Sequence, residues 1–393
     1  MNIDAYKIYE KDIYKKGEVV LMTARHGLLK LENVYDHENS SELFLEAMRE
    51  CLSHHIENCE FFKNLCADAG FKVEDLKTEK DLEKIPPVHA NFFKKYEVLS
   101  VPFETITEHA TSSGTGGQKS QMFFDKDSFD FGNSMIENEF RYYGFLSDEL
   151  TNYLLFTYEP ADVSKDLGTA KTDLGLLSYA PVNDTFFALR YNGQGHDFDV
   201  YGTIAALEEY ERQGKPVRIF GFPSFLYFTV RQMKETGHRP LKLNTKSMTM
   251  LGGGWKGYAD KQIQKSELYA LVEEMLGIPE QNCRDGYGST EHSVPYFECE
   301  KHHFHIPVYS RMIIRDVETL EPLPNGKPGF ANFVTPHLMS VPAVSVLMGD
   351  MAVLHDAEEC GCGIKTPYME ILGRAGTSAT KSCAIKASEL LKR

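Results

Sequence analysis

The sequence predicts an α/β fold in which helix-covered sheets form a large domain and a small β-rich subdomain follows. Up to about position 305, short apolar strand-like runs alternate with amphipathic helical segments. After that point, strand-like runs follow one another without a long helix between them. The chain has 393 residues and can bury a large core. We expect an α/β domain over 1–305, a β-rich subdomain over 306–375 and a short tail over 376–393.

Helices are expected at four places in the first domain. The first opens at a capping pair formed by Asn39 and Glu42. Its apolar face repeats at spacings of three and four through Leu45, Met48, Leu52 and Ile56. The other three each have a polar N-cap and a closing glycine, and they cover 199–214, 224–237 and 260–277.

Strands are expected between these helices and again in the β-rich subdomain. The runs between the helices are apolar and partly β-branched or aromatic, and they cover 152–158, 217–222 and 247–251. The later runs are separated by turn chemistry such as Pro-Asn-Gly, and they cover 311–315, 330–335 and 344–354.

Composition excludes several classes of partner. The formal net charge is −15, which opposes binding to nucleic acid because that binding requires a basic face. No run of about 18 apolar residues is present, so we expect no membrane span. The N-terminal segment is polar and acidic rather than a signal peptide, which favours a cytoplasmic protein. The eight cysteines are unevenly placed and indicate reduced thiols or metal ligands.

A loop over 111–120 combines small, flexible and hydroxyl-bearing residues with one cation. Its glycines let backbone N–H groups approach phosphate oxygens, and Lys119 supplies a positive charge. It is not a Walker A loop, because Ser113 and Gln118 stand where that motif needs glycine. The candidate phosphate-binding residues are Thr111, Ser112, Ser113, Gly114, Thr115, Gly116 and Lys119.

A second glycine-rich stretch, Gly252 to Gly254, follows a strand-like run. With Gly257 it satisfies Gly-x-Gly-x-x-Gly. No second strand with a closing acidic residue follows at the right distance, so the sequence disfavours a dinucleotide site.

The later motifs suit a nucleotide and its metal. The Tyr287 ring can stack on a purine, Thr290 can bond a phosphate oxygen, and Glu291 can hold Mg²⁺. Further along, Asp350 can accept protons from ribose hydroxyl groups, and Arg374 can bind a ribose or phosphate oxygen.

In their order and intervals, these segments resemble the adenylate-forming superfamily of acyl-CoA synthetases and ligases. The resemblance implies the large N-terminal domain of that superfamily, with ATP and Mg²⁺ as cofactors and Lys119 and Glu291 as catalytic residues. It assigns the nucleotide to the loop residues above and to Gly252, Gly253, Gly254, Asp285, Tyr287, Gly288, Thr290, Asp350 and Arg374.

Superfamily members continue with a swinging domain that brings a lysine to the adenylation site. This sequence stops at 393, so the resemblance implies that the swinging domain is absent or vestigial. The work of its lysine then falls to Lys119, Lys256, Lys386 or a partner subunit, and we favour Lys256.

Within the superfamily, the run from Gly252 to Lys256, the early end after Arg374 and a late cysteine resemble the acyl-protein synthetases of the bacterial luciferase fatty acid reductase complex. That family activates a fatty acid to an acyl adenylate, moves the acyl group to its own C-terminal cysteine and passes it to an acyl reductase subunit. Cys383 stands where this cysteine is expected, and two nearby lysines favour its thiolate form.

A metal site is predicted from two groups of residues. Two cysteines one residue apart plus a distant Cys/His pair can form a tetrahedral Zn²⁺ site. The set resembles the structural zinc of the phenylacetate-CoA ligase branch, which implies Cys299, His305, Cys360 and Cys362 as ligands, with His303 as the alternate. The alternative is a set of buried thiols and surface histidines.

Two other functions stay open. One is an aryl- or acyl-CoA ligase of the phenylacetate type. The other is a non-catalytic scaffold that binds nucleotide, and the retained set of Lys119, Glu291, Asp350 and Arg374 argues against it.

Overall fold

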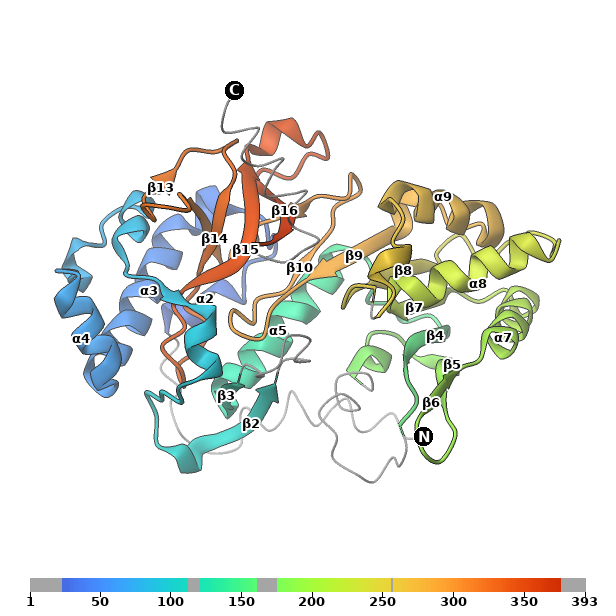
Figure 1. Cartoon of the computed structure of the whole chain (residues 1–393), viewed down its shortest axis with the longest axis horizontal. Coiled ribbons are helices and arrows are strands. Elements are labelled where there is room, and N and C mark those ends of the chain that lie inside the picture. Colours follow the sequence, from blue (N-terminus) through green and yellow to red (C-terminus); the bar gives the residue numbers. More distant parts are fainter. Residues whose placement is uncertain (1–22, 112–120, 161–174, 256, 376–393) are drawn as a thin grey trace.

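The computed structural model describes residues 23–111, 121–160, 175–255 and 257–375. These residues form two seven-stranded sheets and one two-stranded sheet. Helix α5 (Lys126–Tyr142) runs through the middle of the molecule between the two larger sheets (Figure 1). Its residues Phe131, Met135 and Phe140 belong to the hydrophobic core that both sheets share.

The nucleotide motifs found in the sequence lie along one of these sheets, which we call the parallel sheet. Its strand order is β10-β9-β8-β7-β4-β5-β6, and its inner pairs are parallel. The strands are β4 (Thr151–Tyr158), β5 (Val182–Tyr191), β6 (His196–Phe198), β7 (Val217–Gly221), β8 (Met248–Leu251), β9 (Cys283–Tyr287) and β10 (Tyr296–Phe297).

Both faces of the parallel sheet are covered, as predicted. Helices α7 (Val200–Gln213), α8 (Pro223–Glu235) and α9 (Lys265–Leu276) lie on one face, where Leu154 and Phe156 join their hydrophobic cluster. On the other face, Tyr153 and Leu155 join the core around α5. Successive residues of β4 therefore enter different cores, which explains why its sequence is apolar without alternation.

The second large sheet, the antiparallel sheet, carries the later strands of the chain. Its order is β11-β16-β15-β14-β12-β13, and β1 pairs with β15 in parallel. The strands are β1 (Val88–His89), β11 (Phe304–His305), β12 (Arg311–Arg315), β13 (Pro322–Leu323), β14 (Gly329–Val334), β15 (Ser345–His355) and β16 (Tyr368–Arg374). Helices α2 (Ala24–Leu28), α3 (His37–Asn58) and α4 (Glu60–Asp68) lie beside this sheet (Figure 1).

Short elements complete the described part of the chain. The two-stranded sheet consists of β2 (Ile106–Thr111) and β3 (Gln121–Asp125). The 3-10 helices are η2 (Val73–Asp75), η3 (Glu79–Lys84), η4 (Ala90–Lys94), η5 (Phe103–Thr105), η6 (Leu176–Ser178), η7 (Ala259–Lys261), η8 (Glu280–Asn282) and η9 (Ala357–Glu359).

The expected strands are confirmed to within about two residues, but two helix starts are wrong. Asp36, not Asn39, caps α3, and its side chain accepts a hydrogen bond from the Asn39 backbone N–H at 3.1 Å. Helix α9 begins at Lys265 rather than near Asp260, which belongs to η7. Near the start of α3 several polar residues could serve as the cap, and the tertiary path of the chain selects Asp36. Helix α9 has no capping side chain, so no cap residue marks its start in the sequence.

The early cysteines Cys51, Cys59 and Cys66 are free and buried, which agrees with the prediction of reduced thiols or metal ligands. Within the described residues, no helix is both long enough and apolar enough to cross a membrane.

Candidate active site

A cavity of about 490 Å³ opens beside the carboxyl ends of β8 and β9. This is the edge of a parallel sheet where ligands bind in α/β proteins. The loop that follows β9 forms much of its wall, and Ile136 of α5 closes one side. Its lining residues are Ile136, Leu251, Gly252, Gly286, Tyr287, Gly288, Ser289, Thr290, Ser293, Val294, Pro295 and Phe297.

The glycines after β8 have two different roles. Gly252 lines the cavity, and a Cβ atom built on it meets only the Gly286 carbonyl oxygen, at 3.8 Å. Gly253 and Gly254 have φ angles of +73° and +70°, a left-handed conformation that glycine adopts without strain. The turn therefore requires Gly253 and Gly254 for its backbone, and Gly252 leaves room at the cavity wall.

Tyr287, Asp350 and Arg374 come together from three strands. The Tyr287 hydroxyl donates to Asp350 Oδ2 at 3.4 Å, and Arg374 Nε lies 3.6 Å from Asp350 Oδ1. The register of β15 and β16 places Asp350 directly opposite Arg374. Burial raises the pKa of the Asp350 carboxyl, and the positive charge of Arg374 opposes this rise. An acceptor and a cation thus stand next to the ring that lines the cavity.

Asp285 lies beside the cavity but is not among its lining residues. Its Oδ2 atom is 3.2 Å from Lys265 Nζ, and its Oδ1 atom accepts from the Gly286 backbone N–H at 2.9 Å. Burial raises the pKa of Asp285 to about 6, although Lys265 acts in the opposite direction. The carboxylate therefore serves the local network on the α9 side of β9.

Of the other predicted residues in the loop after β9, two line the cavity and one is buried beside them. Gly288 and Thr290 line the cavity, and Glu291 is buried next to it in the chain. Sequence reasoning missed the apolar wall formed by Ile136, Val294 and Phe297, because these residues meet only in the folded chain. Ser289 belongs to the predicted motif without having been assigned a role, and its hydroxyl accepts a hydrogen bond from the His292 backbone N–H, three residues later, at 3.2 Å.

Several predicted residues lie outside the described part of the chain. Thr111 is the last residue of β2, and its partner across the two-stranded sheet is Gln121. The predicted residues between these two strands lie outside the described residues: Ser112, Ser113, Gly114, Thr115, Gly116 and Lys119. The same holds for the predicted residues Lys256, Cys383 and Lys386.

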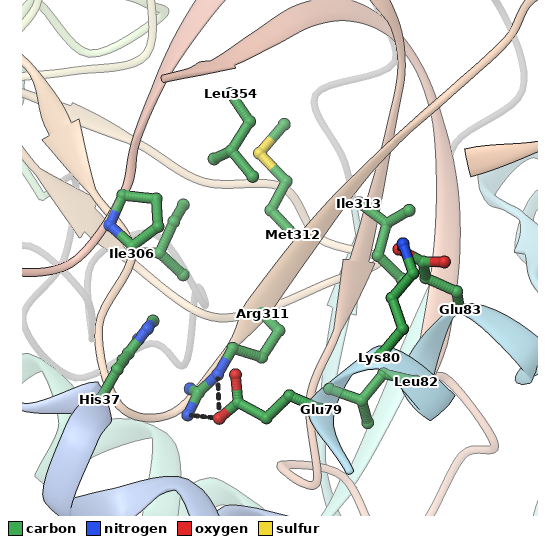
Figure 2. A pocket seen from close by; sticks show the side chains of 11 residues that line it. His37, Glu79, Lys80, Leu82, Glu83, Ile306, Arg311, Met312, Ile313 and Leu354 are labelled. Carbon is green, nitrogen blue, oxygen red and sulfur yellow. Dashed lines mark hydrogen bonds and ion pairs between the residues drawn. The ribbon is translucent and has the colours of Figure 1, made fainter. Parts of the chain in front are cut away.

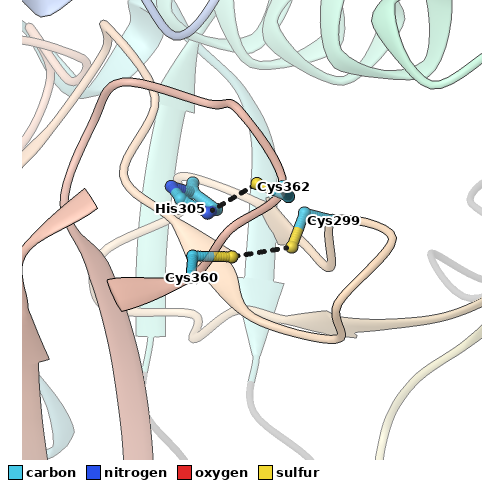
Figure 3. A group of neighbouring side chains, drawn as sticks. All are labelled: Cys299, His305, Cys360 and Cys362. Carbon is cyan, nitrogen blue, oxygen red and sulfur yellow. Dashed lines mark hydrogen bonds between the residues drawn. The ribbon is translucent and has the colours of Figure 1, made fainter. Parts of the chain in front are cut away.

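The predicted metal ligands form one cluster (Figure 3). The ligand atoms of Cys299, His305, Cys360 and Cys362 all lie within 4.8 Å of one another. The Cys299 and Cys360 sulfurs are 3.6 Å apart, and Cys362 Sγ is 3.3 Å from His305 Nε2. Three sulfurs and one imidazole nitrogen are a donor set that suits tetrahedral Zn²⁺.

Contacts behind the cluster orient its ligands. His305 Nδ1 lies 2.6 Å from the Thr366 carbonyl oxygen, so the proton sits on Nδ1 and the Nε2 lone pair points to the cluster. Burial lowers the pKa of His305 to about 4, which keeps the ring neutral. His303 Nδ1 lies 3.1 Å from Cys360 Sγ, and its ring stacks on Tyr368. The four-residue cluster includes His305 and not His303.

A second cavity, of about 270 Å³, lies on the antiparallel sheet (Figure 2). Its wall contains the ion pair of Arg311 with Glu79, at 2.7 Å. Arg311 also donates to the Ser310 carbonyl oxygen at 2.9 Å and lies over the Phe44 ring. The cation is therefore already engaged, and this cavity is lined by none of the predicted site residues.

Comparison with known sequences gives a match over most of the chain. Residues 30–392 match the family described as acyl-protein synthetase, LuxE. A long-chain-fatty-acid–luciferin-component ligase of Vibrio harveyi is 24% identical over 361 residues, covering 90% of this chain and 89% of the relative. A ligase of the same description from Aliivibrio fischeri is 22% identical over 389 residues, covering 97% of each chain.

Solved structures confirm the predicted fold class. A 2-hydroxyisobutyryl-CoA ligase in an open conformation, in complex with 2-HIB-AMP and CoA, superposes with a TM-score of 0.62 at 15% identity. The match covers 87% of this chain and 76% of that chain. The same ligase in its postadenylation state gives a TM-score of 0.63 at 14% identity, covering 88% of this chain and 69% of that chain.

Proposed function

Because the chain belongs to the acyl-protein synthetase (LuxE) family, we propose that it activates a fatty acid with ATP and then transfers the acyl group through a thiol. The curated relatives are described as long-chain-fatty-acid ligases, which supports a fatty acid as the substrate. The acceptor in the final step is a partner acyl reductase.

The observation that carries this proposal is the convergence of separate motifs on one cavity. Gly252, Tyr287 and Thr290 line it, and the Tyr287 hydroxyl contacts Asp350, which faces Arg374. A volume of about 490 Å³ lies in the range of small-molecule sites. Asp350 and Arg374 are not among the lining residues, but they stand beside the Tyr287 ring that is. The proposal is supported because an aromatic face, hydroxyl groups, a carboxylate and a guanidinium lie close together, as a nucleoside phosphate requires.

In the first step, a carboxylate oxygen of the fatty acid attacks the α-phosphorus of ATP. The new phosphorus–oxygen bond forms as the bond to pyrophosphate breaks, which gives an acyl adenylate. Tyr287 packs on the adenine, Asp350 accepts from the ribose hydroxyl groups, and Arg374 binds a ribose or phosphate oxygen. The loop that contains Lys119 neutralises the departing pyrophosphate. Lys256 takes the part that a swinging-domain lysine has in the wider superfamily.

Glu291 supplies the candidate ligand for Mg²⁺. It is buried beside the cavity-lining Thr290, and a carboxylate oxygen suits this ion. When bound, Mg²⁺ neutralises phosphate charge.

In the second step, the Cys383 thiolate attacks the acyl carbonyl carbon, and AMP leaves with the electron pair of the broken carbon–oxygen bond. AMP is a good leaving group, so the mixed anhydride makes this transfer favourable. The resulting thioester then passes its acyl group to the reductase. The support for Cys383 comes from its place in the sequence alone.

The Cys/His cluster is proposed to hold a structural zinc ion. Cys299, His305, Cys360 and Cys362 would fill a tetrahedral shell, which leaves no open position for substrate. Cys299 follows β10, and Cys360 and Cys362 lie between β15 and β16. Zinc at this position would link the end of the parallel sheet to the antiparallel sheet.

ATP–pyrophosphate exchange across carboxylic acids of different length and aromaticity tests the proposal. We expect exchange that depends on a long-chain fatty acid and is insensitive to coenzyme A. Release of free acyl-CoA on addition of coenzyme A would instead favour a CoA ligase. A lack of exchange with every acid would leave only the nucleotide-binding scaffold.

A further inference from the structure

In the chain, Glu298 lies between Phe297, which lines the nucleotide cavity, and Cys299 of the Cys/His cluster. It follows the last residue of β10 and directly precedes the cluster residue Cys299. Its side chain is fully buried, with 0% exposed. Burial of a carboxylate is costly unless several partners stabilise its charge, so the contacts of Glu298 indicate what holds this part of the chain in place.

The carboxylate of Glu298 is bound to strand β9 and helix α9. Its Oε2 atom accepts from the Asp285 backbone N–H at 2.8 Å and from the Tyr269 hydroxyl at 3.1 Å. Its Oε1 atom pairs with the ammonium group of Lys265. Lys265 also pairs with Asp285, at 3.2 Å. One ammonium group therefore serves two carboxylates, and both belong to segments that lead to a proposed site.

The backbones of the two segments are tied in the same region. Glu298 N donates to the Asp285 carbonyl oxygen at 3.1 Å, and Arg284 Nη1 donates to the Glu298 carbonyl oxygen at 2.8 Å. The next residues of β9, Gly286 and Tyr287, line the nucleotide cavity. A shift of Glu298 would therefore displace the strand that presents the aromatic ring.

On the other side, the loop after Glu298 is shaped by the cluster. Cys299 N donates to the His303 carbonyl oxygen at 2.9 Å, and Glu298 forms an antiparallel bridge with Phe304. Cys299 Sγ lies 3.6 Å from Cys360 Sγ. A bound metal ion would fix Cys299 against Cys360 and His305, and so would fix the position from which Glu298 reaches β9.

We propose that Glu298, with Lys265 as its counter-ion, is a positioning residue that couples metal binding at the Cys/His cluster to ATP binding at the cavity. This inference rests on the proposed function. With zinc bound, the loop holds Glu298 against Asp285 N and Lys265, and Tyr287 is presented to the nucleotide. With zinc removed, Cys299 no longer fixes the backbone position of Glu298, so the contacts of Glu298 with β9 weaken and ATP binds more weakly.

The test compares zinc-loaded protein with chelator-stripped protein by calorimetric titration with ATP and by metal analysis. Wild type is measured beside Glu298→Ala. The matched control is Glu274→Ala, since Glu274 lies on α9 and pairs with Lys234 of α8 at 2.7 Å, away from β9. For wild type and control, we expect stripping to weaken ATP binding about five-fold or more. In Glu298→Ala, ATP binds weakly in both forms, with a ratio near one.

Each outcome decides the matter. Equal ATP affinity of loaded and stripped wild type, a wild-type protein that takes up no zinc, or a five-fold ratio preserved in Glu298→Ala overturns the coupling. If the loaded wild type binds no ATP, the proposed function itself fails and the coupling fails with it. If Glu298→Ala does not fold, Lys265→Met replaces it, because Lys265 is partly exposed, and the same loss of the ratio is expected.

Discussion

The hydroxyl group of Tyr287 lies 3.4 Å from the carboxylate of Asp350, although the two residues are 63 positions apart. Tyr287 ends β9 of the parallel sheet, and Asp350 lies within β15 of the antiparallel sheet. The proposed nucleotide site is therefore built where the two sheets meet. Its geometry depends on how they are held together, not on either sheet alone.

Asp350→Ala should weaken the use of ATP while leaving the fold intact. Loss of a charged hydrogen-bond acceptor costs about 1.5–3 kcal/mol, so the KM for ATP in pyrophosphate exchange should rise about 10-fold or more. Tyr287→Phe keeps the ring and should change the KM much less. The control is Asp356→Ala, because Asp356 is exposed at the start of η9 and accepts a hydrogen bond from the Asn325 side-chain amide at 2.7 Å. An unchanged KM in Asp350→Ala would remove Asp350 from the nucleotide site.

Gly252→Val should obstruct the cavity without strain on the backbone. A Cβ atom at Gly252 meets no atom nearer than 3.8 Å, so the melting temperature should hardly change while the KM for ATP rises about 10-fold. Gly254→Val is the comparison, because its φ of +70° makes any Cβ atom cost about 1–2 kcal/mol. That variant should lose stability. Equal ATP kinetics in Gly252→Val and wild type would show that the nucleotide does not reach this wall.

Cys362→Ala should abolish zinc binding and destabilise the protein by about 4 kcal/mol or more, since a structural metal contributes directly to folding. Metal content by mass spectrometry and urea unfolding are the measurements. Cys51→Ala is the control, because Cys51 is a buried thiol of α3 far from the cluster in the sequence. His305→Ala should lose zinc, whereas His303→Ala should keep it. Zinc retained in both Cys362→Ala and His305→Ala would contradict the assigned ligand set.

Acid should destabilise the protein through its buried histidines. Burial lowers the pKa of His55 to about 3, whereas an unfolded histidine has a pKa of about 6.5. Between about pH 3 and pH 6.5 the unfolded chain binds more protons at this ring than the folded chain does. The free energy of unfolding therefore falls as the pH falls, by up to about 1.4 kcal/mol per pH unit for this ring.

The variant His55→Gln isolates this effect. At pH 7.5 the substitution should lower the free energy of unfolding, because it removes the contacts of His55 with Ser100 Oγ at 2.6 Å and with the Leu338 carbonyl oxygen at 3.0 Å. The cost should shrink by about 2 kcal/mol between pH 6.5 and 4.5, as measured by urea unfolding. His196→Gln, at an exposed ring, is the control. A cost that stays constant with pH would exclude a neutral buried His55.

The sequence predicted those parts of the fold that depend on local pattern. Strands β4, β7 and β8 were recognisable because burial on both faces produces continuous apolar runs. The start of α3 was missed because Asp36 and Asn39 are both good N-caps, and only the structure shows which one bonds to the first turn.

In the candidate site too, residues within local motifs were predicted, whereas contacts between distant residues were not. The motif residues Gly252 and Tyr287 were predicted in the same site, and both line one cavity. The ligand spacing left His303 and His305 open, because residues two apart on an extended chain project to the same side. The four-residue cluster contains His305 and not His303, and the contact of His305 Nδ1 with Thr366 O supports our proposal that His305 is the ligand. The link from Lys265 to Glu298 spans 33 positions, and no local pattern marks such a contact.

The most direct test of the central claim is to identify the products formed by Cys383→Ser from ATP and a long-chain fatty acid. This variant blocks the proposed second step, so the intermediate of the first step should accumulate. We expect acyl adenylate and pyrophosphate in amounts close to the protein concentration, detected by mass spectrometry only when the acid is present. Formation of ADP and phosphate, or of no acyl adenylate at all, would contradict the account.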